Sequence, residues 1–525
     1  MTGWADRTRY GRGGVVCSVD HLASSAGVAV LRSGGSAADA AVATSAVLAV
    51  TTQHMCGAGG DLLALVAPGG GGEPRALLAV GRAGSGSDAD RLRAEGHVRM
   101  PFRDDPRTVT VPGCVDGWLA LHTTYGRLSL TEVLAPAIGY ATDGFPVSPL
   151  LAAAMPLVAD VRGGEDFAQV PAVAGTLLRR PRLAASLADI AKEGREAWYG
   201  GAFGRGLLAV GEGLFSPKDL ADDLAEWTDP ATLQVDGRRL PSTPAPTAGY
   251  LFLAGAAVAA ELSAGAAAMA GDPHLLVESA RVTGYDRPAR LADGVGCESL
   301  LDGMAARAEL VRPDRALDLP VPAEAGGTIY LCAADADGML VSLSQSNAAG
   351  FGAHLAVPEV GVFLHNRGIG FSLQPGHPAE LRPGARPTHT LCPSLIQGPD
   401  GTTTAIGTMG GDAQPQVLLQ LLAALDGGAT PAGALARPRW VLNGPRSDGF
   451  DTWEPWPDGA VATTVSLEAA APAEWEQALV ERGHLVSRAD ATRGFGHAHL
   501  AVRRPDGLVA GASDPRAGTG DAQAL

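Results

Sequence analysis

The stretch that most constrains the fold spans residues 326–347, where two strand-forming segments flank a short turn. The first segment starts with β-branched and aromatic side chains, and the second, residues 339–346, runs back beside it. Between them, Asp335 and Gly338 supply turn chemistry, because aspartate can bond to nearby backbone and glycine tolerates a positive φ. The stretch is therefore predicted to form a β-hairpin.

The open end of this hairpin brings a threonine next to hydroxyl and amide side chains. A two-residue loop places Thr328 opposite Gln345, and one more loop residue places it opposite Ser346. Two interpretations are open from this stretch alone. Thr328 is either an ordinary strand threonine after a flexible Gly-Gly joint, or a nucleophile that becomes N-terminal when the chain is cut before it.

An N-terminal threonine carries its own base. The Thr328 hydroxyl would attack the Gly327 carbonyl and break the chain there, and the new α-amine would then serve as the general base for that hydroxyl. A free α-amine has a pKa of about 8, close to the range that this task requires. The second interpretation therefore predicts self-cleavage between Gly327 and Thr328.

Further motifs follow in order along the chain. They are Gly-Thr-Ile-Tyr at residues 327–330, Asp-x-Asp-Gly at 335–338, Gln-Ser-Asn at 345–347, Gly-Phe-Gly at 350–352, Pro-x-x-Gly at 358–361, Arg-Pro at 386–387, Gly-x-x-Gly-Gly at 407–411 and Ser-Asp-Pro-Arg at 513–516. The ordered set resembles the γ-glutamyltransferase family of N-terminal-nucleophile (Ntn) hydrolases. A Gly-Gly-Ser-Ala-Ala-Asp-Ala-Ala run at residues 34–41 resembles the N-terminal signature of that family, so the resemblance spans nearly the whole chain.

The resemblance also implies a fold. The mixed order of helical and strand patterns indicates an α+β or α/β protein. The resemblance implies the α+β class with a four-layer αββα sandwich, in which two antiparallel sheets lie between helical layers. It further implies one intertwined domain made of a larger chain, residues 1–327, and a smaller chain, residues 328–525, which stay associated after cleavage.

The resemblance assigns roles outside the hairpin. Arg82 stands where the family binds the substrate carboxylate, and a guanidinium can hold a carboxylate through two hydrogen bonds. Gly410 and Gly411 precede a predicted helix, and their backbone N–H groups suit an oxyanion hole. Ser346 joins Thr328 and these glycines as a catalytic residue. The ordinary alternatives are a surface arginine and a plain turn.

The chain departs from the family pattern where the α-amino group of the substrate is normally held. Where the family has an aspartate, this chain has Gly370, and where the family has an upstream glutamine or glutamate, it has Arg367. The family's serine pair is replaced by His389 and Thr390. A cation in place of a carboxylate disfavours an α-ammonium substrate and favours a second carboxylate or a neutral group. The ordinary alternatives are an arginine that faces solvent or pairs elsewhere, and a packed core histidine. Besides Arg82, the predicted substrate contacts are Asn347, Arg367, His389 and Thr390.

Three functional hypotheses follow. The first is an enzyme that hydrolyses or transfers a γ-glutamyl-type or related amide through an acyl-enzyme. The second is a repurposed enzyme of cytoplasmic antibiotic biosynthesis that cleaves a C–C bond next to a keto acid, similar in concept to the γ-glutamyltransferase-like enzymes of the alkylproline branch in lincomycin and pyrrolobenzodiazepine pathways. The third is an uncleaved binding homologue without catalysis. The implied reaction needs no metal or organic cofactor, so none is expected.

Composition and apolar patterns limit which binding partners and which cellular location are expected. The net charge of −16 argues against nucleic acid. The first residues lack the apolar core of a signal peptide, and the apolar run 248–270 contains Glu261 and much alanine, so a buried core helix is predicted there rather than a membrane span. The six cysteines form no Cys-x-x-Cys pair. We expect a cytoplasmic protein with no membrane partner that binds a small molecule with a carboxylate; a homodimer is left open.

Three local predictions bear on the site. Residues 313–327, rich in Pro, Ala and Gly, are predicted to be an exposed linker, which suits a segment to be cut and moved aside. Residues 57–61 are predicted to form a tight turn rather than a phosphate loop, because no lysine follows and the glycines precede a strand. Ser36 and Asp39 are predicted to form a capping box that starts a buried helix.

Overall fold

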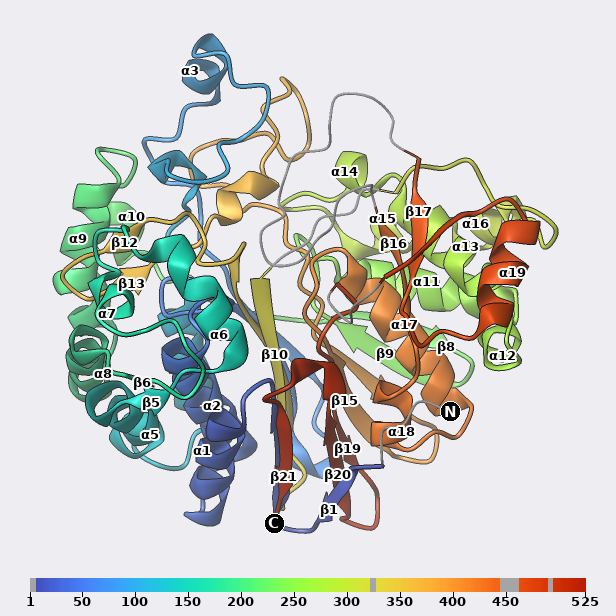
Figure 1. The fold of residues 1–525 in the computed structure, drawn as a ribbon, viewed down its shortest axis with the longest axis horizontal. Coiled ribbons are helices and arrows are strands. Elements are labelled where there is room, and N and C mark those ends of the chain that lie inside the picture. The colour runs from blue at the N-terminus through green and yellow to red at the C-terminus, as the bar shows by residue number, and fades with distance from the viewer. Residues whose placement is uncertain (1–5, 322–326, 444–461, 490–493) are drawn as a thin grey trace.

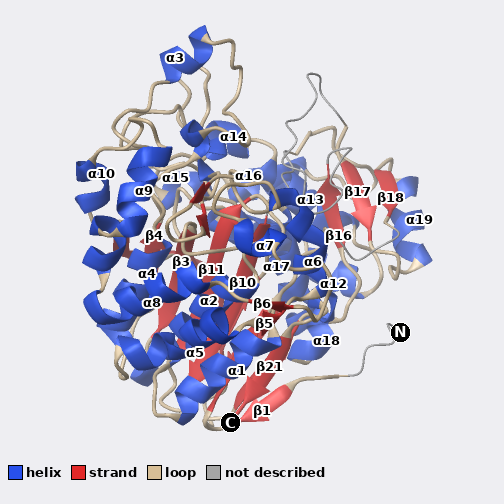
Figure 2. Cartoon of the chain, turned by 60° about the vertical axis from the view of Figure 1, so that its left-hand side comes forward, coloured by secondary structure: helices blue, strands red, loops and turns tan. Residues whose placement is uncertain are grey.

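The structure is a computed structural model that describes residues 6–321, 327–443, 462–489 and 494–525. Two seven-stranded sheets lie at its centre, with helices outside them (Figures 1 and 2). In spatial order the first sheet contains β21 (Asp521–Ala524), β2 (Gly14–Ser18), β10 (Gly327–Asp335), β11 (Leu340–Ala348), β3 (Asp61–Ala67), β4 (Arg75–Ala79) and β7 (Ala225–Thr228). All neighbouring strands in it are antiparallel.

The second sheet is also antiparallel throughout. In spatial order it contains β1 (Arg9–Gly11), β20 (Val509–Ser513), β19 (His499–Arg503), β15 (Thr403–Gly407), β14 (Ser394–Gln397), β9 (Arg238–Ser242) and β8 (Ala231–Val235). Side chains of both sheets form one buried cluster, which includes Tyr330 and Cys332 of β10 and Ala501 of β19. The two sheets therefore pack face to face.

Helices cover the outer face of the first sheet. They include α1 (His21–Arg32), α2 (Ala37–Thr51), α4 (Cys114–Tyr125), α5 (Leu130–Asp143) and α8 (Pro181–Glu193). Helix α2 is buried along its whole length and contacts β10 and β11. The predicted capping box at its start is confirmed: Ser36 and Asp39 satisfy each other's backbone N–H groups. Asp39 also accepts hydrogen bonds from the N–H groups of Arg127 and Leu128.

A second helical layer covers the other sheet. It includes α11 (Gly249–Glu261), α12 (Ala264–Met269), α13 (His274–Gly284) and α17 (Ala413–Asp426). The first part of the apolar run 248–270 forms a buried helix as predicted, whereas residues 261–270 are mostly half-buried or exposed. The run forms two helices, because the chain turns at Ser263 with φ of 51°. Within the described residues, none of the helices has the length and apolar character that a membrane crossing requires. The α+β class and the four-layer αββα sandwich are confirmed.

The remaining elements lie around this sandwich. Further helices are α3 (Ala89–Ala94), α6 (Pro149–Ala154), α7 (Glu165–Ala168), α9 (Ala202–Val210), α10 (Pro217–Ala221), α14 (Arg287–Arg290), α15 (Cys297–Leu301), α16 (Met304–Leu310), α18 (Pro431–Leu435) and α19 (Ala473–Glu481). Further strands are β5 (Phe145–Pro146), β6 (Leu177–Leu178), β12 (Ala356–Val357), β13 (Val362–Phe363), β16 (Trp440–Asn443), β17 (Thr464–Leu467) and β18 (Leu485–Arg488). The 3₁₀ turn η5 (Arg367–Gly370) follows β13.

The predicted linker is more firmly held than its composition indicates. Its described part, residues 313–321, is mostly exposed, but side chains of α13 bind its backbone. Glu278 accepts a hydrogen bond from Leu317 N–H, and Arg281 donates one to the Leu319 carbonyl. The prediction of an exposed linker is therefore largely right for this part, although its backbone is tied to α13. Residues 322–326 lie outside the described residues.

Candidate active site

The candidate site begins where β10 starts. The register of β10 and β11 pairs Ile329 with Gln345 and carries a bulge between Gly327 and Ile329. This register matches the longer of the two predicted loops, because the Thr328 hydroxyl lies 3.0 Å from the Ser346 hydroxyl. Thr328 is 1% exposed, and both strands are buried along their whole length. The predicted hairpin is confirmed, with its threonine next to a serine.

Ser346 is the centre of a hydrogen-bond cluster. Its hydroxyl donates to the Gly327 carbonyl at 2.8 Å and accepts from the Ala348 N–H at 2.9 Å. The guanidinium of Arg367, on η5, also donates to it at 3.0 Å. The Ser346 hydroxyl thus binds the carbonyl that precedes Thr328, and a cation binds that hydroxyl. Charge that develops on this carbonyl oxygen during attack by a hydroxyl would be stabilised there.

Arg367 does not face solvent, since it is only 1% exposed. The ordinary alternative of a solvent-facing arginine is therefore excluded. Its guanidinium binds a serine that touches the candidate nucleophile, which places the cation directly beside Thr328. Whether Arg367 also contacts a substrate stays a prediction.

A buried carboxylate with two imidazoles lies next to this cluster. Asp61, the first residue of β3, is the strand partner of Ser346. Its Oδ2 lies 3.4 Å from Nδ1 of His365 and 3.9 Å from Nε2 of His389. All three side chains are fully buried. His389, predicted from sequence as a substrate contact, therefore belongs to a buried polar group and not to an apolar core.

Both imidazoles are neutral in this environment. Burial lowers the pKa of His389 well below its usual range, and the Arg367 guanidinium adds to this effect. Burial also lowers the pKa of His365, although the Asp61 carboxylate acts in the opposite direction. The cluster thus contains two neutral imidazoles near a permanent cation.

The other oxygen of Asp61 organises the loop that carries Arg82. Asp61 Oδ1 accepts hydrogen bonds from Gly81 N–H at 3.1 Å and from Gly113 N–H at 3.3 Å. The next residue, Arg82, follows β4, has a side chain that is 41% exposed, and donates to the Gly384 carbonyl at 3.0 Å. Its guanidinium is thus accessible enough to receive a carboxylate. The predicted substrate role of Arg82 stays a prediction.

The predicted oxyanion loop lies between β15 and α17. Gly407, at the end of β15, packs closely against the Tyr330 ring, two residues beyond Thr328. Gly410 and Gly411 follow with φ of 127° and 57°, conformations that glycine adopts readily. Helix α17 begins at Ala413. The sequence prediction of two glycines before a helix is therefore confirmed, whereas their role in catalysis stays a prediction.

Two further predicted contacts are buried. Asn347 is 1% exposed and donates from its side-chain amide to the Gln53 carbonyl at 3.2 Å. The same amide packs against Gly60. A hydrogen bond from Gly60 N–H to the Gly57 carbonyl confirms the predicted tight turn of residues 57–61. Thr390 is 3% exposed and follows His389.

The backbone near Gly370, which stands at the position of the family's aspartate, leaves no room for a side chain. A Cβ there would lie 2.5 Å from the Thr388 carbonyl oxygen and 3.0 Å from its nitrogen. A side chain at this position would therefore require the backbone to move, so that an aspartate cannot simply be restored by substitution.

Asp61 and His365 are functional candidates that sequence reasoning missed. The sequence analysis places Asp61 only at the end of the predicted turn of residues 57–61. The available signal was a charged residue directly before the apolar run 62–67, because a buried strand rarely starts with an unpaired carboxylate.

Comparisons with known proteins agree with this architecture. The family described as Gamma-glutamyltranspeptidase matches residues 23–524. The oxamate amidohydrolase proenzyme of Klebsiella pneumoniae subsp. pneumoniae is 33% identical, over 96% of this chain and 97% of its own length. The glutathione hydrolase-like YwrD proenzyme of Bacillus subtilis is also 33% identical, with the same coverage of 96% and 97%. The crystal structure of cephalosporin acylase from Bacillus halodurans matches with a TM-score of 0.87 and 30% identity, over 100% of this chain and 98% of that chain.

The sandwich and these relatives define the class of protein. It is an enzyme, an Ntn hydrolase, and the hypothesis of a non-catalytic binding homologue is set aside. More narrowly, the chain belongs to the γ-glutamyltranspeptidase family.

Proposed function

We propose that this protein is an autoprocessed amidohydrolase that uses Thr328 as its nucleophile and acts on a small molecule with a carboxylate. The observation that carries the proposal is the cluster at the head of β10. The Thr328 hydroxyl lies beside Ser346, whose own hydroxyl binds the carbonyl of the residue to be cut, Gly327. The relatives support it because two of them are proenzymes.

The first step is self-cleavage. Thr328 Oγ1 attacks the Gly327 carbonyl carbon, the bond between that carbon and the Thr328 nitrogen breaks, and an ester joins the two residues. The hydroxyl proton moves to the departing nitrogen. Ser346 and Arg367 stabilise the oxyanion that forms on the Gly327 oxygen. Water then hydrolyses the ester and leaves Thr328 with a free α-amine.

The two fragments stay associated because their strands alternate in both sheets. Within the first sheet, β10 and β11 of the smaller fragment lie between β2 and β3 of the larger one. Within the second sheet, β14 of the smaller fragment pairs with β9 of the larger one. Separation would break both ladders and expose the cluster between the sheets, so cleavage leaves one intertwined unit.

Turnover uses the same hydroxyl. The Thr328 α-amine takes its proton, Oγ1 attacks the substrate carbonyl, and the N–H groups of Gly410 and Gly411 hold the oxyanion. The amine of the substrate leaves with the proton, and water releases the acyl group. Arg82 holds the carboxylate of the acyl group by a paired hydrogen bond.

The substrate class follows from the charges around Thr328. Arg367 is buried beside the nucleophile, and the aspartate position is Gly370, where a side chain does not fit. Asp61 is the nearby carboxylate, but one oxygen accepts two backbone hydrogen bonds and the other faces two imidazoles. A buried ammonium without a counter-charge is costly, by a few kcal/mol or more in order of magnitude. We therefore propose an acyl group without an α-amine, such as a glutaryl or oxo-acid group. The oxamate relative supports this class, since oxamate has a carboxylate and no ammonium.

The substrate test compares matched anilides. The kcat/KM of the wild type for a glutaryl anilide should exceed that for the γ-glutamyl anilide by at least about tenfold, since each ~1.4 kcal/mol is a decade in rate. A preference of that size for the γ-glutamyl compound would contradict the proposed substrate class. Keto-acid metabolites with a C–C bond in place of the amide form a third arm, and faster turnover of these would favour the repurposed enzyme of antibiotic biosynthesis.

The nucleophile is tested separately. The glutaryl anilide is mixed with enzyme, the reaction is quenched, and the peptides are analysed by mass spectrometry. The account predicts a glutaryl adduct on the peptide that begins with Thr328. An adduct confined to another residue would contradict the proposed role of Thr328.

A further inference from the structure

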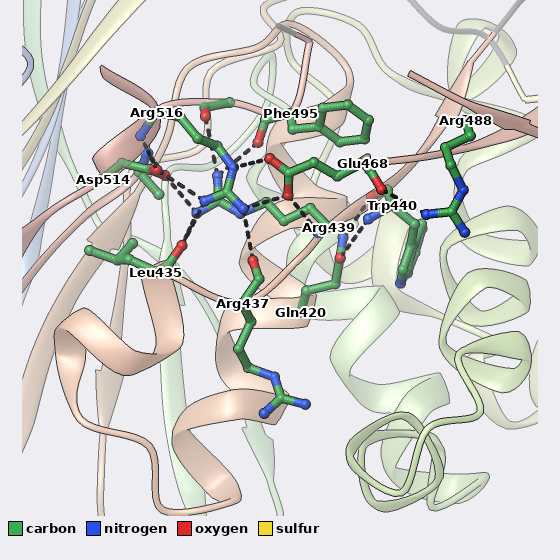
Figure 3. A network of polar contacts seen from close by, with 12 residues as sticks. Gln420, Leu435, Arg437, Arg439, Trp440, Glu468, Arg488, Phe495, Asp514 and Arg516 are labelled. Atoms are coloured by element: carbon green, nitrogen blue, oxygen red, sulfur yellow. Dashed lines mark hydrogen bonds and ion pairs between the residues drawn. The ribbon is translucent and has the colours of Figure 1, made fainter. Parts of the chain in front are cut away.

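The Ser-Asp-Pro-Arg motif at residues 513–516 has no part in the chemistry described so far, yet its charged residues are buried. Asp514 and Arg516 join Arg439 and Glu468 in a group of ion pairs, which we call the arginine network (Figure 3). All four side chains are at most 4% exposed. Removing one partner of such a network is costly, because it leaves an uncompensated buried charge.

Direct contacts link the four residues. Arg439 donates to Asp514 Oδ2 at 2.6 Å, and Arg516 donates to Asp514 Oδ1 at 3.1 Å. Arg516 also binds both oxygens of Glu468, at 2.7 and 2.6 Å. Burial raises the pKa of Asp514, but the Arg439 and Arg516 guanidiniums outweigh it and hold that pKa well below its usual range. Asp514 is therefore ionised and paired with both guanidiniums.

The network binds the backbone of residues 435–437 and also that of a loop, residues 495–498. The Arg439 guanidinium donates to the carbonyls of Phe495 and Gly496, at 2.8 and 3.2 Å. Asp514 Oδ2 accepts a hydrogen bond from Ala498 N–H at 2.9 Å. Three backbone groups of the loop are thus fixed by two charged side chains (Figure 3).

The same loop packs against residues 408–411, the proposed oxyanion loop. A Cβ on Gly496 would lie 2.5 Å from Thr408 Oγ1 and 2.8 Å from the Met409 carbonyl oxygen. A Cβ on Gly410 would lie 3.5 Å from the Gly496 Cα, and Met409 N–H donates to the His497 carbonyl at 3.4 Å. The 495–498 loop therefore lies between the arginine network and the oxyanion loop.

We propose that Arg439 and Gly496 are positioning residues that set the orientation of the Gly410 and Gly411 N–H groups. This inference rests on the proposed role of those two glycines and adds the residues that orient them. An oxyanion hole depends on donors within a fraction of an ångström of the developing charge. Arg439 fixes the 495–498 loop, and Gly496 lets that loop approach the oxyanion loop without a side chain between them.

The first test substitutes Gly496 and, as its control, Gly494, which directly precedes the loop. Gly494 and Gly496 have similar φ, 90° and 77°, so that alanine imposes similar backbone strain at both. A Cβ on Gly494 meets nothing within 4 Å among the described atoms, whereas a Cβ on Gly496 meets the oxyanion loop. Gly496→Ala should lower kcat for the glutaryl anilide by about tenfold to a hundredfold with little change in KM. Gly494→Ala should behave as wild type.

Self-cleavage supplies the readout that separates positioning from folding. The Gly327 carbonyl accepts a hydrogen bond from Ser346 on β11, a strand outside the 408–411 loop. Gly496→Ala should therefore cleave as completely as wild type and still turn over slowly. Equal kcat in the two alanine variants would overturn the inference, and so would joint loss of cleavage and turnover in Gly496→Ala at normal expression of folded protein.

A second pair of variants decides the matter if Gly496→Ala does not fold. Arg439→Lys keeps the charge but lacks the planar guanidinium, so lysine cannot bind both loop carbonyls and Asp514 together. Arg437→Lys is the matched control, because the Arg437 side chain points away from the network in Figure 3. The Arg439 variant should show the same loss of kcat with normal cleavage, and the Arg437 variant neither. Wild-type kcat in Arg439→Lys would overturn the inference.

Failure of the proposed function gives a different result. If Thr328 is not the nucleophile, the glutaryl adduct is absent from the wild type itself. If only the positioning inference fails, the wild-type adduct forms on Thr328 and the four variants acylate at indistinguishable rates.

Discussion

Arg82 is the residue whose proposed task can be tested most simply. Lysine keeps the positive charge but loses the planar fork that matches a carboxylate, so Arg82→Lys should raise KM for the glutaryl anilide by about tenfold or lower kcat/KM to the same extent. Steady-state kinetics measures this change. Arg91→Lys is a suitable control, since Arg91 is an exposed arginine that pairs with Glu95 on the helix surface. Wild-type kinetics in Arg82→Lys would remove Arg82 from the site.

At the residue scale, local sequence predicted only part of the site. The hairpin register alone brought Thr328 to Ser346, because the turn residues limit the loop length to two choices. The hairpin register could not identify Asp61. Asp61 and Ser346 are partners on neighbouring strands, but they lie 285 residues apart in sequence (346 − 61). His365 and His389 meet Asp61 only after three separate segments fold together.

At the element scale, the start of α2 offers a clear test of what holds the helical layer to the first sheet. Asp39 accepts hydrogen bonds from Ser36 and also from the N–H groups of Arg127 and Leu128. Asp39→Ala should therefore destabilise the protein by about 2–4 kcal/mol, because it removes a cap and leaves the buried Ser36 N–H and two part-buried N–H groups unpaired. Chemical denaturation measures the change. Glu132→Ala, in the exposed capping box of α5, loses only the cap and should cost about 1 kcal/mol. An equal effect of both substitutions would contradict this account of Asp39.

Elements with strong local signals were predicted well, and short strands were not. The capping box, the apolar helix after it and the hairpin at residues 327–348 each carry their own sequence pattern. By contrast, β16, β17 and β18 have four residues each, and β18 is mostly exposed. Such strands exist because of their neighbours in the sheet, and a single sequence carries little signal for them.

At the scale of the whole molecule, buried histidines make stability depend on pH. Burial lowers the pKa of His54, His484 and His499 to about 3 and that of His497 to about 4. The unfolded chain has histidine pKa values of about 6.5, so it binds more protons than the folded protein below that pH. Stability from these groups is therefore present above pH ~6.5 and is lost as the pH falls.

The melting temperature should accordingly fall by about 5 °C between pH 7.5 and pH 5.5. Asp116, whose pKa burial raises to about 6, acts in the opposite direction and reduces the fall. His499→Phe keeps the ring that stacks on Tyr330 and removes one titrating group, so its melting temperature should depend less on pH. Scanning calorimetry at both pH values measures the effect. A melting temperature that rises towards pH 5.5 would show that the carboxylates dominate.

The central claim is that the chain becomes two, with Thr328 as the first residue of the second. Intact-mass measurement with N-terminal sequencing of the purified protein tests it most directly. The account predicts two masses, for residues 1–327 and 328–525, a smaller fragment that begins Thr-Ile-Tyr, and a Thr328→Ala variant that stays one inactive chain of 525 residues. A fully active protein that remains a single uncut chain would contradict the account.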